Sequence, residues 1–154
     1  MSRSAAGREL VTKEVIFYVD GACSGNHLQG KRGRMGAGIV ARSGPIEKAW
    51  GIPLGEGTNQ RAELLAVKEA LLRVKDRPHS AVTVYSDSQY AIGALCGGWK
   101  VKANPEIVDE VRALIVECAS FRMAKVPGHA GHPENELANE LAVRAALTGQ
   151  PHRE

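Results

Sequence analysis

The sequence predicts an α/β domain in which helices flank a mixed five-stranded sheet, with three antiparallel strands followed by two parallel strands. Three observations lead to this fold class. Three apolar, strand-like segments follow one another near the N-terminus. Helical and strand-like patterns then alternate along the rest of the chain. The length of 154 residues and the hydrophobic content of 44% suit one domain with one sizeable core.

The first three strands are expected over residues 14–20, 37–41 and 46–53. A glycine-rich, basic loop at 21–36 separates the first two, and Ser-Gly-Pro at 43–45 marks a turn between the second and third. Three strands in such close succession favour antiparallel hairpins.

A helix is expected over 59–74, because its apolar residues recur at helical spacing and Thr58 can cap its N-terminus. Strands and helices then alternate to the end of the chain. They are a strand at 82–86, a helix opened by the capping box Ser86-x-x-Gln89 and stopped by Gly97-Gly98, a helix from Asn104-Pro105 to about 119, a strand at 121–126, and a helix from Pro133 to just before Gly149.

We expect a single domain at 13–148, with flexible termini at 1–12 and 149–154. The net charge of +3 permits a nucleic-acid partner without arguing for one. The three cysteines are far apart, which argues against a disulfide framework or a zinc site. The sequence has neither an apolar segment of membrane-spanning length nor a signal-peptide core at its N-terminus. The expected location is therefore the cytoplasm.

Three carboxylates stand where apolar residues are expected. Asp20 and Asp87 end two predicted strands, and Glu63 lies on the apolar face of a predicted helix. Read singly, they could serve a turn, a helix cap and a buried salt bridge. A carboxylate near a core is costly unless it is paired or holds a metal, so three from separate elements indicate a hard-cation site.

Four segments around these residues resemble type 1 ribonuclease H over residues 15–147, nearly the whole chain. Together they are specific, whereas any one alone would be weak. They are Tyr-Val-Asp-Gly-Ala-Cys-Ser-Gly-Asn (18–26), Gly-Thr-Asn-Gln-Arg-Ala-Glu-Leu (57–64), Tyr-Ser-Asp-Ser-Gln-Tyr (85–90) and Val-Pro-Gly-His-Ala-Gly-His-Pro-Glu-Asn-Glu-Leu-Ala-Asn-Glu-Leu-Ala (126–142). The resemblance implies an endonuclease that cuts the RNA strand of RNA–DNA hybrids and leaves 5′-phosphate and 3′-hydroxyl ends.

The resemblance also implies a two-metal mechanism with Mg²⁺, for which Mn²⁺ could substitute. It makes Asp20 the ligand shared by both ions, with Glu63 and Asp87 holding the ion near the leaving group. Two such ions, about 3.5–4 Å apart, position the attacking water and stabilise the leaving oxygen. His129, in the loop Pro-Gly-His-Ala-Gly, takes a helping role in proton transfer or product release; the alternative is an ordinary surface histidine. His132 is expected only to precede the last helix.

Small polar residues match the family positions that line the hybrid groove, where the 2′-hydroxyl distinguishes RNA from DNA. Asn26 and Asn59 could instead be ordinary turn or helix-capping residues, and Trp99 could instead pack in the core. The matching positions are Gly21, Cys23, Asn26, Asn59, Gln60 and Gln89, together with Thr58 for a phosphate and Trp99 for the DNA strand.

The chain departs from the family pattern in two loops. The loop at 27–36 is longer than usual, and its Lys31, Arg32 and Arg34 either contact phosphates or are simply solvated. The region after Trp99 lacks the long basic insertion of some family members, so hybrid affinity must come from elsewhere.

Asn139 is the more consequential departure, because the family pattern has aspartate there. Val143 and Ala146 share its helix face, so we expect its side chain to point toward the sheet and the metal site. Asparagine lacks the negative charge, so the water-side ion should bind weakly and this copy should be weakly active or inactive. Asn139 is either a tolerated natural variant or a substitution that suppresses turnover while keeping substrate binding.

Two other functions fit the same fold. One is a non-catalytic module that binds RNA–DNA hybrids, against which the presence of all three carboxylates argues. The other is an integrase-, transposase- or resolvase-like enzyme, since these share the sheet and its acids. We expect a monomer with no obligate protein partner.

Overall fold

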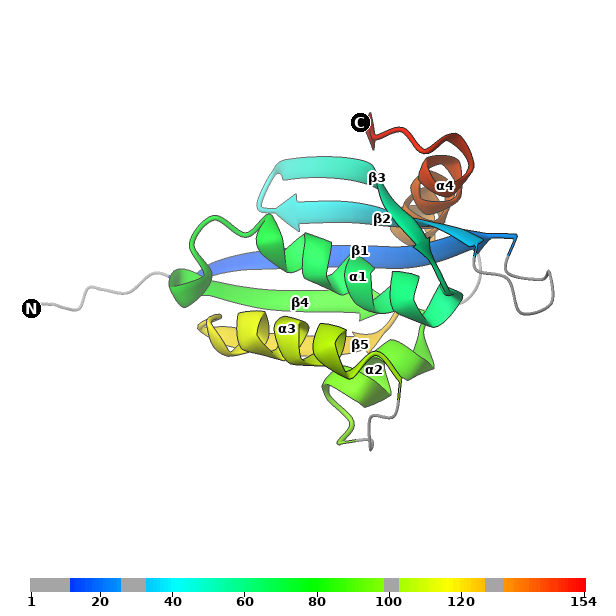
Figure 1. Cartoon of the computed structure of the whole chain (residues 1–154). Helices are drawn as coiled ribbons and strands as arrows, with labels where there is room; N and C mark the ends of the chain where they lie inside the picture. Colours follow the sequence, from blue (N-terminus) through cyan, green and yellow to red (C-terminus); the bar gives the residue numbers. More distant parts are fainter. Residues whose placement is uncertain (1–11, 26–32, 99–102, 127–131) are drawn as a thin grey trace, which may run out of the picture.

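The computed structural model describes residues 12–25, 33–98, 103–126 and 132–154. They form a six-stranded mixed sheet in the order β5-β4-β1-β2-β3-β6, with helices on both faces (Figure 1). β1, β2 and β3 are antiparallel, whereas β1, β4 and β5 are parallel. The predicted fold class, three antiparallel strands followed by two parallel ones, is confirmed, and one further strand is added.

The antiparallel strands are longer than predicted. β1 spans Lys13–Ser24, β2 spans Gly33–Ser43 and β3 spans Ile46–Gly57. Much of the extra length of β1 and β2 lies in glycine-rich segments of the expected loop at 21–36. These segments pair through their backbones. Asp20 therefore does not end its strand: it lies within β1, opposite Gly38 of β2.

The helical elements and parallel strands follow the predicted order. α1 spans Asn59–Leu72, and the side chain of Thr58 caps it by accepting a hydrogen bond from the Arg61 backbone N–H at 3.2 Å. The predicted capping box at Ser86 is wrong, because Ser88 is the N-cap residue and accepts from the Ala91 N–H at 3.0 Å. The other bounds are η2 Arg77–His79, β4 Ser80–Ser86, α2 Gln89–Leu95, α3 Pro105–Val116, β5 Ser120–Lys125 and α4 Pro133–Thr148.

The sixth strand lies in a segment that we expected to be a flexible end. β6 spans His152–Arg153 and pairs with the edge strand β3, where Arg153 lies opposite Trp50. Glu154 extends the pairing, since its N–H donates to the Ala49 carbonyl at 2.9 Å. A two-residue strand has no alternating pattern, so only the backbone pairing reveals it.

Two clusters of apolar side chains fill the two faces of the sheet. α1, α2 and α3 cover one face, where Phe17 and Val19 of β1 belong to the larger cluster (Figure 1). α4 covers the other face, where Tyr18 packs with Val40 and Leu141. Neighbouring residues of β1 thus serve opposite layers, as the two-residue period of a strand requires.

α4 rests directly on the backbone of the sheet. Three glycines, Gly36, Gly38 and Gly51, lie beneath it, and we call them the glycine floor. A Cβ atom added to Gly38 would overlap the carbonyl oxygen of Ala138 and lie 2.8 Å from the Ala142 nitrogen. Side chains at these positions would therefore push the helix away from the sheet.

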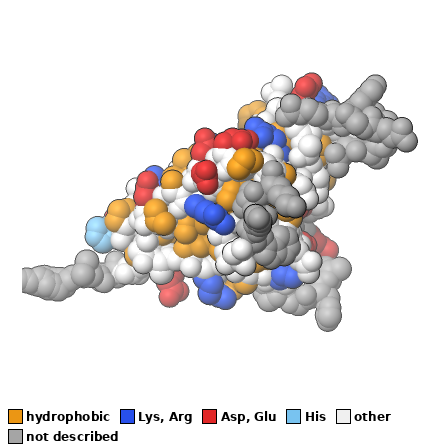
Figure 2. All heavy atoms as spheres, turned by 60° about the horizontal axis from the view of Figure 1, so that its bottom comes forward, with side chains coloured by type: hydrophobic (Ala, Val, Ile, Leu, Met, Phe, Trp, Pro, Cys, Tyr) orange, Lys and Arg blue, Asp and Glu red, His pale blue; other side chains and the backbone are white. Residues whose placement is uncertain are grey.

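Charges are mixed over the part of the surface that Figure 2 shows. Acidic and basic side chains alternate there with hydrophobic ones, and neither sign covers the described residues of this face (Figure 2). This agrees with the small net charge of +3. Among the described residues, no helix is both long and apolar enough to span a membrane.

Candidate active site

The three predicted carboxylates come from three elements that meet at one end of the sheet. Asp20 belongs to β1, Glu63 to the beginning of α1, and Asp87 follows the end of β4. The Gly21 N–H donates to Glu63 Oε1 at 2.9 Å. A Cβ atom at Gly21 would stand only 2.5 Å from the Glu63 nitrogen. The glycine therefore permits the close approach of β1 and α1 that brings Glu63 beside Asp20.

Two asparagine amides of α4 hold the other two carboxylates. Asn139 Nδ2 donates to Asp20 Oδ2 at 2.6 Å, and Asn135 Nδ2 donates to Asp87 Oδ2 at 3.0 Å. Sequence reasoning missed Asn135. The repeat Asn-Glu-Leu-Ala-Asn-Glu-Leu-Ala carried the signal, because residues four apart lie on the same helix face.

Asn139 reaches Asp20 as expected, but the helix face on which it lies is only partly buried. Its supposed neighbour on a buried face, Val143, is 40% exposed, and Asn139 itself is exposed. The residues of α4 that pack on the sheet include Ala138 and Ala142. Asn139 therefore lies at the edge of the packed face and reaches Asp20 from that edge.

The carboxylates form a poorly compensated group of negative charge. Burial raises the pKa of Asp20, and the nearby Asp87 raises it further, although the Asn139 hydrogen bond opposes this. Burial and the charge of Asp20 raise the pKa of Glu63 to about 8. Within the described ranges, no lysine or arginine forms an ion pair with any of the three.

The donor set suits a hard cation, but it is not in ligating geometry. Among the described residues, no three His, Cys, Asp or Glu side chains converge closely enough to hold an ion. The reason is visible in the hydrogen bonds: each carboxylate is turned toward an N–H donor, from Gly21, Asn135 or Asn139. If Asn139 were a ligand, its amide would have to present its oxygen to the site in place of the nitrogen that now donates to Asp20.

Replacing Glu63 with glutamine should stabilise the protein above pH 5. The carboxyl pKa is raised from 4.5 to about 8 on folding, so the folded state binds more protons than the unfolded state between these pH values. Stability from this group is therefore lost as the pH rises through that window. After a discount for solvent screening, Glu63→Gln should gain roughly 2 kcal/mol at pH 8 and almost nothing at pH 4.

Urea unfolding of both proteins across this pH range, without divalent ions, measures the difference. Glu136→Gln on the exposed side of α4 is the matched control and should show no such pH dependence. If Glu63→Gln gained the same stability at pH 4 and at pH 8, the raised pKa of Glu63 would be contradicted.

Apart from Gly21, which donates to Glu63, the predicted substrate-contacting residues and His129 divide into three groups. Cys23 donates its thiol to the Gly57 carbonyl at 3.3 Å, and Thr58 is engaged as a helix cap. The amides of Asn59, Gln60 and Gln89 are exposed at the beginnings of α1 and α2. Asn26, Trp99 and His129 lie outside the described residues.

Of the basic residues in the two loops that differ from the family pattern, the structure describes only some. Arg34 donates to the Leu147 carbonyl at 2.6 Å and so binds the end of α4. Lys31 and Arg32 lie outside the described residues, as does the segment that follows Trp99. His132 precedes α4 as expected, and its ring packs against Tyr18 with centroids 5.1 Å apart.

Comparisons with known proteins agree with the fold. A model of the RNase H family matches residues 12–147. The ribonuclease H of Paracidovorax citrulli is 42% identical over 146 residues, which cover 84% of this chain and 91% of that protein. The ribonuclease H of Desulforamulus reducens is 37% identical over 147 residues, with 87% and 88% covered.

Solved structures of ribonucleases H also resemble this chain. RNase H1 from the halophilic archaeon Halobacterium salinarum NRC-1 is 28% identical with a TM-score of 0.70, over 89% of this chain and 99% of that one. LC9-RNase H1, described as a type 1 RNase H with the type 2 active-site motif, is 26% identical with a TM-score of 0.74, over 95% and 80%. The chain therefore belongs to the RNase H family and is of type 1.

Proposed function

We propose that this protein hydrolyses the RNA strand of RNA–DNA hybrids at the site of Asp20, Glu63 and Asp87, with two Mg²⁺ ions as cofactors. The observation that carries the proposal is that these three carboxylates, from three separate elements, lie near one another at one end of a ribonuclease H sheet. Their electrostatic coupling supports it, because a group of repelling carboxylates with no ion-pair partner among the described residues is stabilised by a divalent cation.

The proposed ligand roles are those that the resemblance to the family implies. Asp20 would contact both ions, Glu63 and Asp87 would hold the one near the leaving group, and Asn139 would serve the other through its amide oxygen. When bound, the ions supply an activated water and stabilise the leaving oxygen. Magnesium is favoured by an oxygen-only donor set, and manganese could replace it for the same reason.

The chain's own groups then orient the site and the substrate. The Gly21 N–H fixes one oxygen of Glu63, and the Asn135 amide fixes one oxygen of Asp87. The exposed amides of Asn59, Gln60 and Gln89 can both donate to and accept from a 2′-hydroxyl, which is the group that marks the RNA strand. His129 is proposed to move a proton or to assist product release.

A labelled hybrid tests the proposal. In the presence of Mg²⁺ the chain should cut only the RNA strand and leave 5′-phosphate ends, while duplex DNA, duplex RNA and branched DNA remain intact. Cleavage should fail when the metal is chelated. Hybrid binding that persists without metal, with no cleavage even by Asn139→Asp, would overturn the proposal in favour of a binding module, which family membership does not favour.

Replacing Asn139 with aspartate should raise activity by lowering the Mg²⁺ requirement. A fourth carboxylate adds a negative ligand to the water-side ion, so half-maximal cleavage should need about tenfold less Mg²⁺. The same change removes the amide that now donates to Asp20 and adds repulsion, so the variant should unfold at a lower temperature without divalent ions. A Mg²⁺ titration of hybrid cleavage measures the first effect. Identical titration curves for the two proteins would refute the proposed weak metal binding of the chain with Asn139.

We also propose that the enzyme acts as a monomer in the cytoplasm, where its cysteines remain reduced. The thiols of Cys23, Cys96 and Cys118 are free in the structure. Sedimentation of the purified chain at several concentrations would test the monomer.

A further inference from the structure

The helix that carries both asparagine amides begins without a side-chain cap. His132 occupies the N-cap position of α4 and Pro133 follows it, but within the part of the chain that the structure describes the His132 side chain makes no capping hydrogen bond. The helical ladder starts where the Glu136 N–H donates to the His132 carbonyl at 2.9 Å. An uncapped first turn is the part of a helix that frays most readily, so contacts with the sheet have to hold it.

The two asparagines depend on this first turn to different degrees. Asn139 follows Ala138, whose carbonyl lies against Gly38 of the glycine floor, so the floor holds the helix at that point. Asn135 is the third residue of α4 and precedes the closest contacts with the floor. Its amide donates to Asp87 at 3.0 Å. The position of this amide therefore depends on the groups that anchor the first turn.

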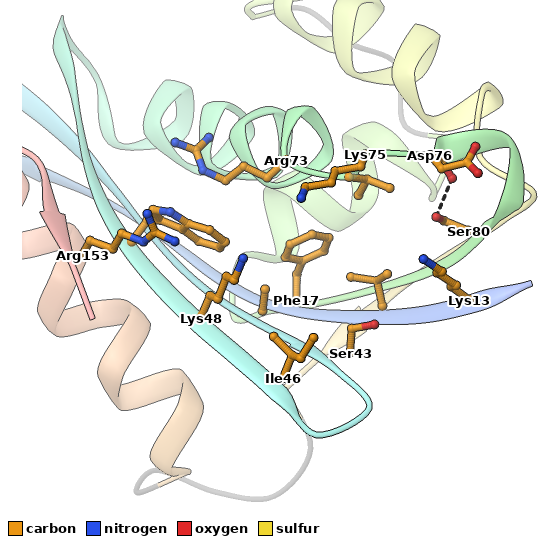
Figure 3. Close-up of a pocket in the computed structure, with 14 residues that line it drawn as sticks. Lys13, Phe17, Ser43, Ile46, Lys48, Arg73, Lys75, Asp76, Ser80 and Arg153 are labelled. Carbon is orange, nitrogen blue, oxygen red and sulfur yellow. Dashed lines mark hydrogen bonds between the residues drawn. The ribbon is translucent and has the colours of Figure 1, made fainter.

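The ring of His132 supplies one anchor. Phe17 of β1 lines a hollow of about 510 Å³ on the α1 side of the sheet (Figure 3), so its neighbour Tyr18 points to the α4 side. There the His132 and Tyr18 ring centroids lie 5.1 Å apart. Tyr18 in turn stacks on Tyr85 of β4, with centroids 5.2 Å apart. His132 is thus packed on a buried aromatic side chain of the strand that carries Asp20.

The imidazole of His132 also faces a carboxylate. His132 Nδ1 is buried, and among the described residues it has no hydrogen-bond partner, since Glu134 Oε1 lies 3.5 Å away. A carboxylate only accepts, so this contact is attractive when the ring carries its proton on Nδ1. The second oxygen of Glu134 accepts from Arg42 Nη1 of β2 at 2.7 Å. A buried ring nitrogen without a full partner costs free energy, and its place beside Glu134 indicates a role.

We propose that His132 is a positioning residue for hybrid cleavage. Its Nδ1–H holds Glu134, and the pair fixes the first turn of α4 on the sheet. Asn135 then orients Asp87, which is a ligand of the ion near the leaving group in the proposed function on which this inference rests. His132 acts through these groups and not by contact with the reacting atoms. Its loss should leave Asn139 in place, because the glycine floor holds that part of the helix.

Two substitutions separate the ring of His132 from its nitrogen. His132→Phe keeps a ring against Tyr18, so it should unfold within about 3 °C of the parent, while kcat for hybrid cleavage falls about tenfold and KM stays within about twofold. His132→Asn loses the ring but keeps an N–H donor near the place of Nδ1, so it should unfold about 5 °C lower yet cleave within about threefold of the parent. Activity that follows stability across the two variants would overturn the proposal in favour of packing alone.

The carboxylate tests the same link from the other side. Glu134→Gln keeps the size of the side chain but offers one oxygen where the carboxylate offers two, so it cannot accept from both Arg42 and His132. It should lower kcat about tenfold, and adding His132→Phe should lower it no further, since both changes remove one interaction. Glu47→Gln is the matched control, because Glu47 also pairs with Arg42, at 3.4 Å, and this variant should cleave at the parent rate. Additive losses in the double variant would contradict the shared role.

Magnetic resonance of the metal-free, isotope-labelled full chain tests the positioning without any activity. The side-chain amide signals of Asn135 and Asn139 report the hydrogen bonds that these amides donate to the carboxylates. His132→Phe should move the Asn135 signals toward those of a free amide and leave the Asn139 signals unchanged. Unchanged Asn135 signals would overturn the positioning role. A parent chain that cleaves no hybrid, but whose Asn135 signals move in the variant, would overturn the proposed function and leave the link from His132 to Asn135 standing.

Discussion

Replacing Asp20 with asparagine should reduce hybrid cleavage by about a thousandfold, which corresponds to about 4 kcal/mol of transition-state stabilisation. Asp20 is the proposed ligand of both ions, so the loss of its charge weakens both at once. The substitution keeps the size of the side chain and leaves an amide oxygen that can accept from Asn139, as Asp20 Oδ2 now does. The expected loss is therefore one of charge and not of structure.

The stability of Asp20→Asn shows whether its activity is lost through the missing charge or through a damaged fold. Burial raises the pKa of Asp20, so its ionised form is disfavoured in the folded protein, and Asp20→Asn should be at least as stable as the parent at pH 7. Single-turnover cleavage at saturating hybrid and thermal unfolding measure the two effects. Asp109→Asn, at an exposed position of α3, is the matched control and should cleave at the parent rate. A stable Asp20→Asn protein that keeps a tenth of the activity would contradict the proposed metal site.

Replacing Gly38 with alanine should destabilise the protein by about 3 kcal/mol, which lowers the unfolding temperature by about 10 °C for a chain of this length. The added methyl would overlap the Ala138 carbonyl oxygen of α4, and backbone atoms cannot rotate away as a flexible side chain can. Either the helix or the strand must shift. Because α4 carries Asn135 and Asn139, the shift should also lower cleavage by the protein that remains folded.

Gly44→Ala is the control for this prediction. Gly44 has φ +59° and no atom within 4 Å of an added Cβ, so its replacement costs only backbone strain, about 1 kcal/mol. Thermal unfolding of both variants isolates the cost of the helix contact. Equal losses in the two would show that α4 is free to move off the sheet.

Much of the fold could be predicted from the sequence because apolar periodicity and caps are local signals. The helix that begins after Thr58 and the strand at 82–86 were predicted from such signals and are confirmed. The extension of β1 to Ser24 was missed because glycine-rich strands pair through their backbones alone. β6 was missed for a related reason, since its pairing depends on a distant edge strand.

The candidate site was predictable to the extent that unusual residues interrupt regular patterns. Asp20, Glu63 and Asp87 stood out because they are charged where the pattern is apolar. Asn135 did not stand out, because an asparagine near a helix N-terminus is ordinary and only the contact with Asp87 gives it a role.

The glycine floor gives α4 an unusual tolerance to mutation on its outer side. The helix meets Gly36, Gly38 and Gly51 largely with its own backbone, so at these three positions backbone contact limits the distance between the helix and the sheet. Residues such as Glu136 and Glu140, which point outward, can vary without moving the two asparagine amides. A saturation scan of α4 should therefore find permissive outer positions beside intolerant ones that touch the floor. The outer face of this helix is thus the part of the active-site wall on which new properties, such as altered surface charge or an attached tag, can be introduced at least cost to activity.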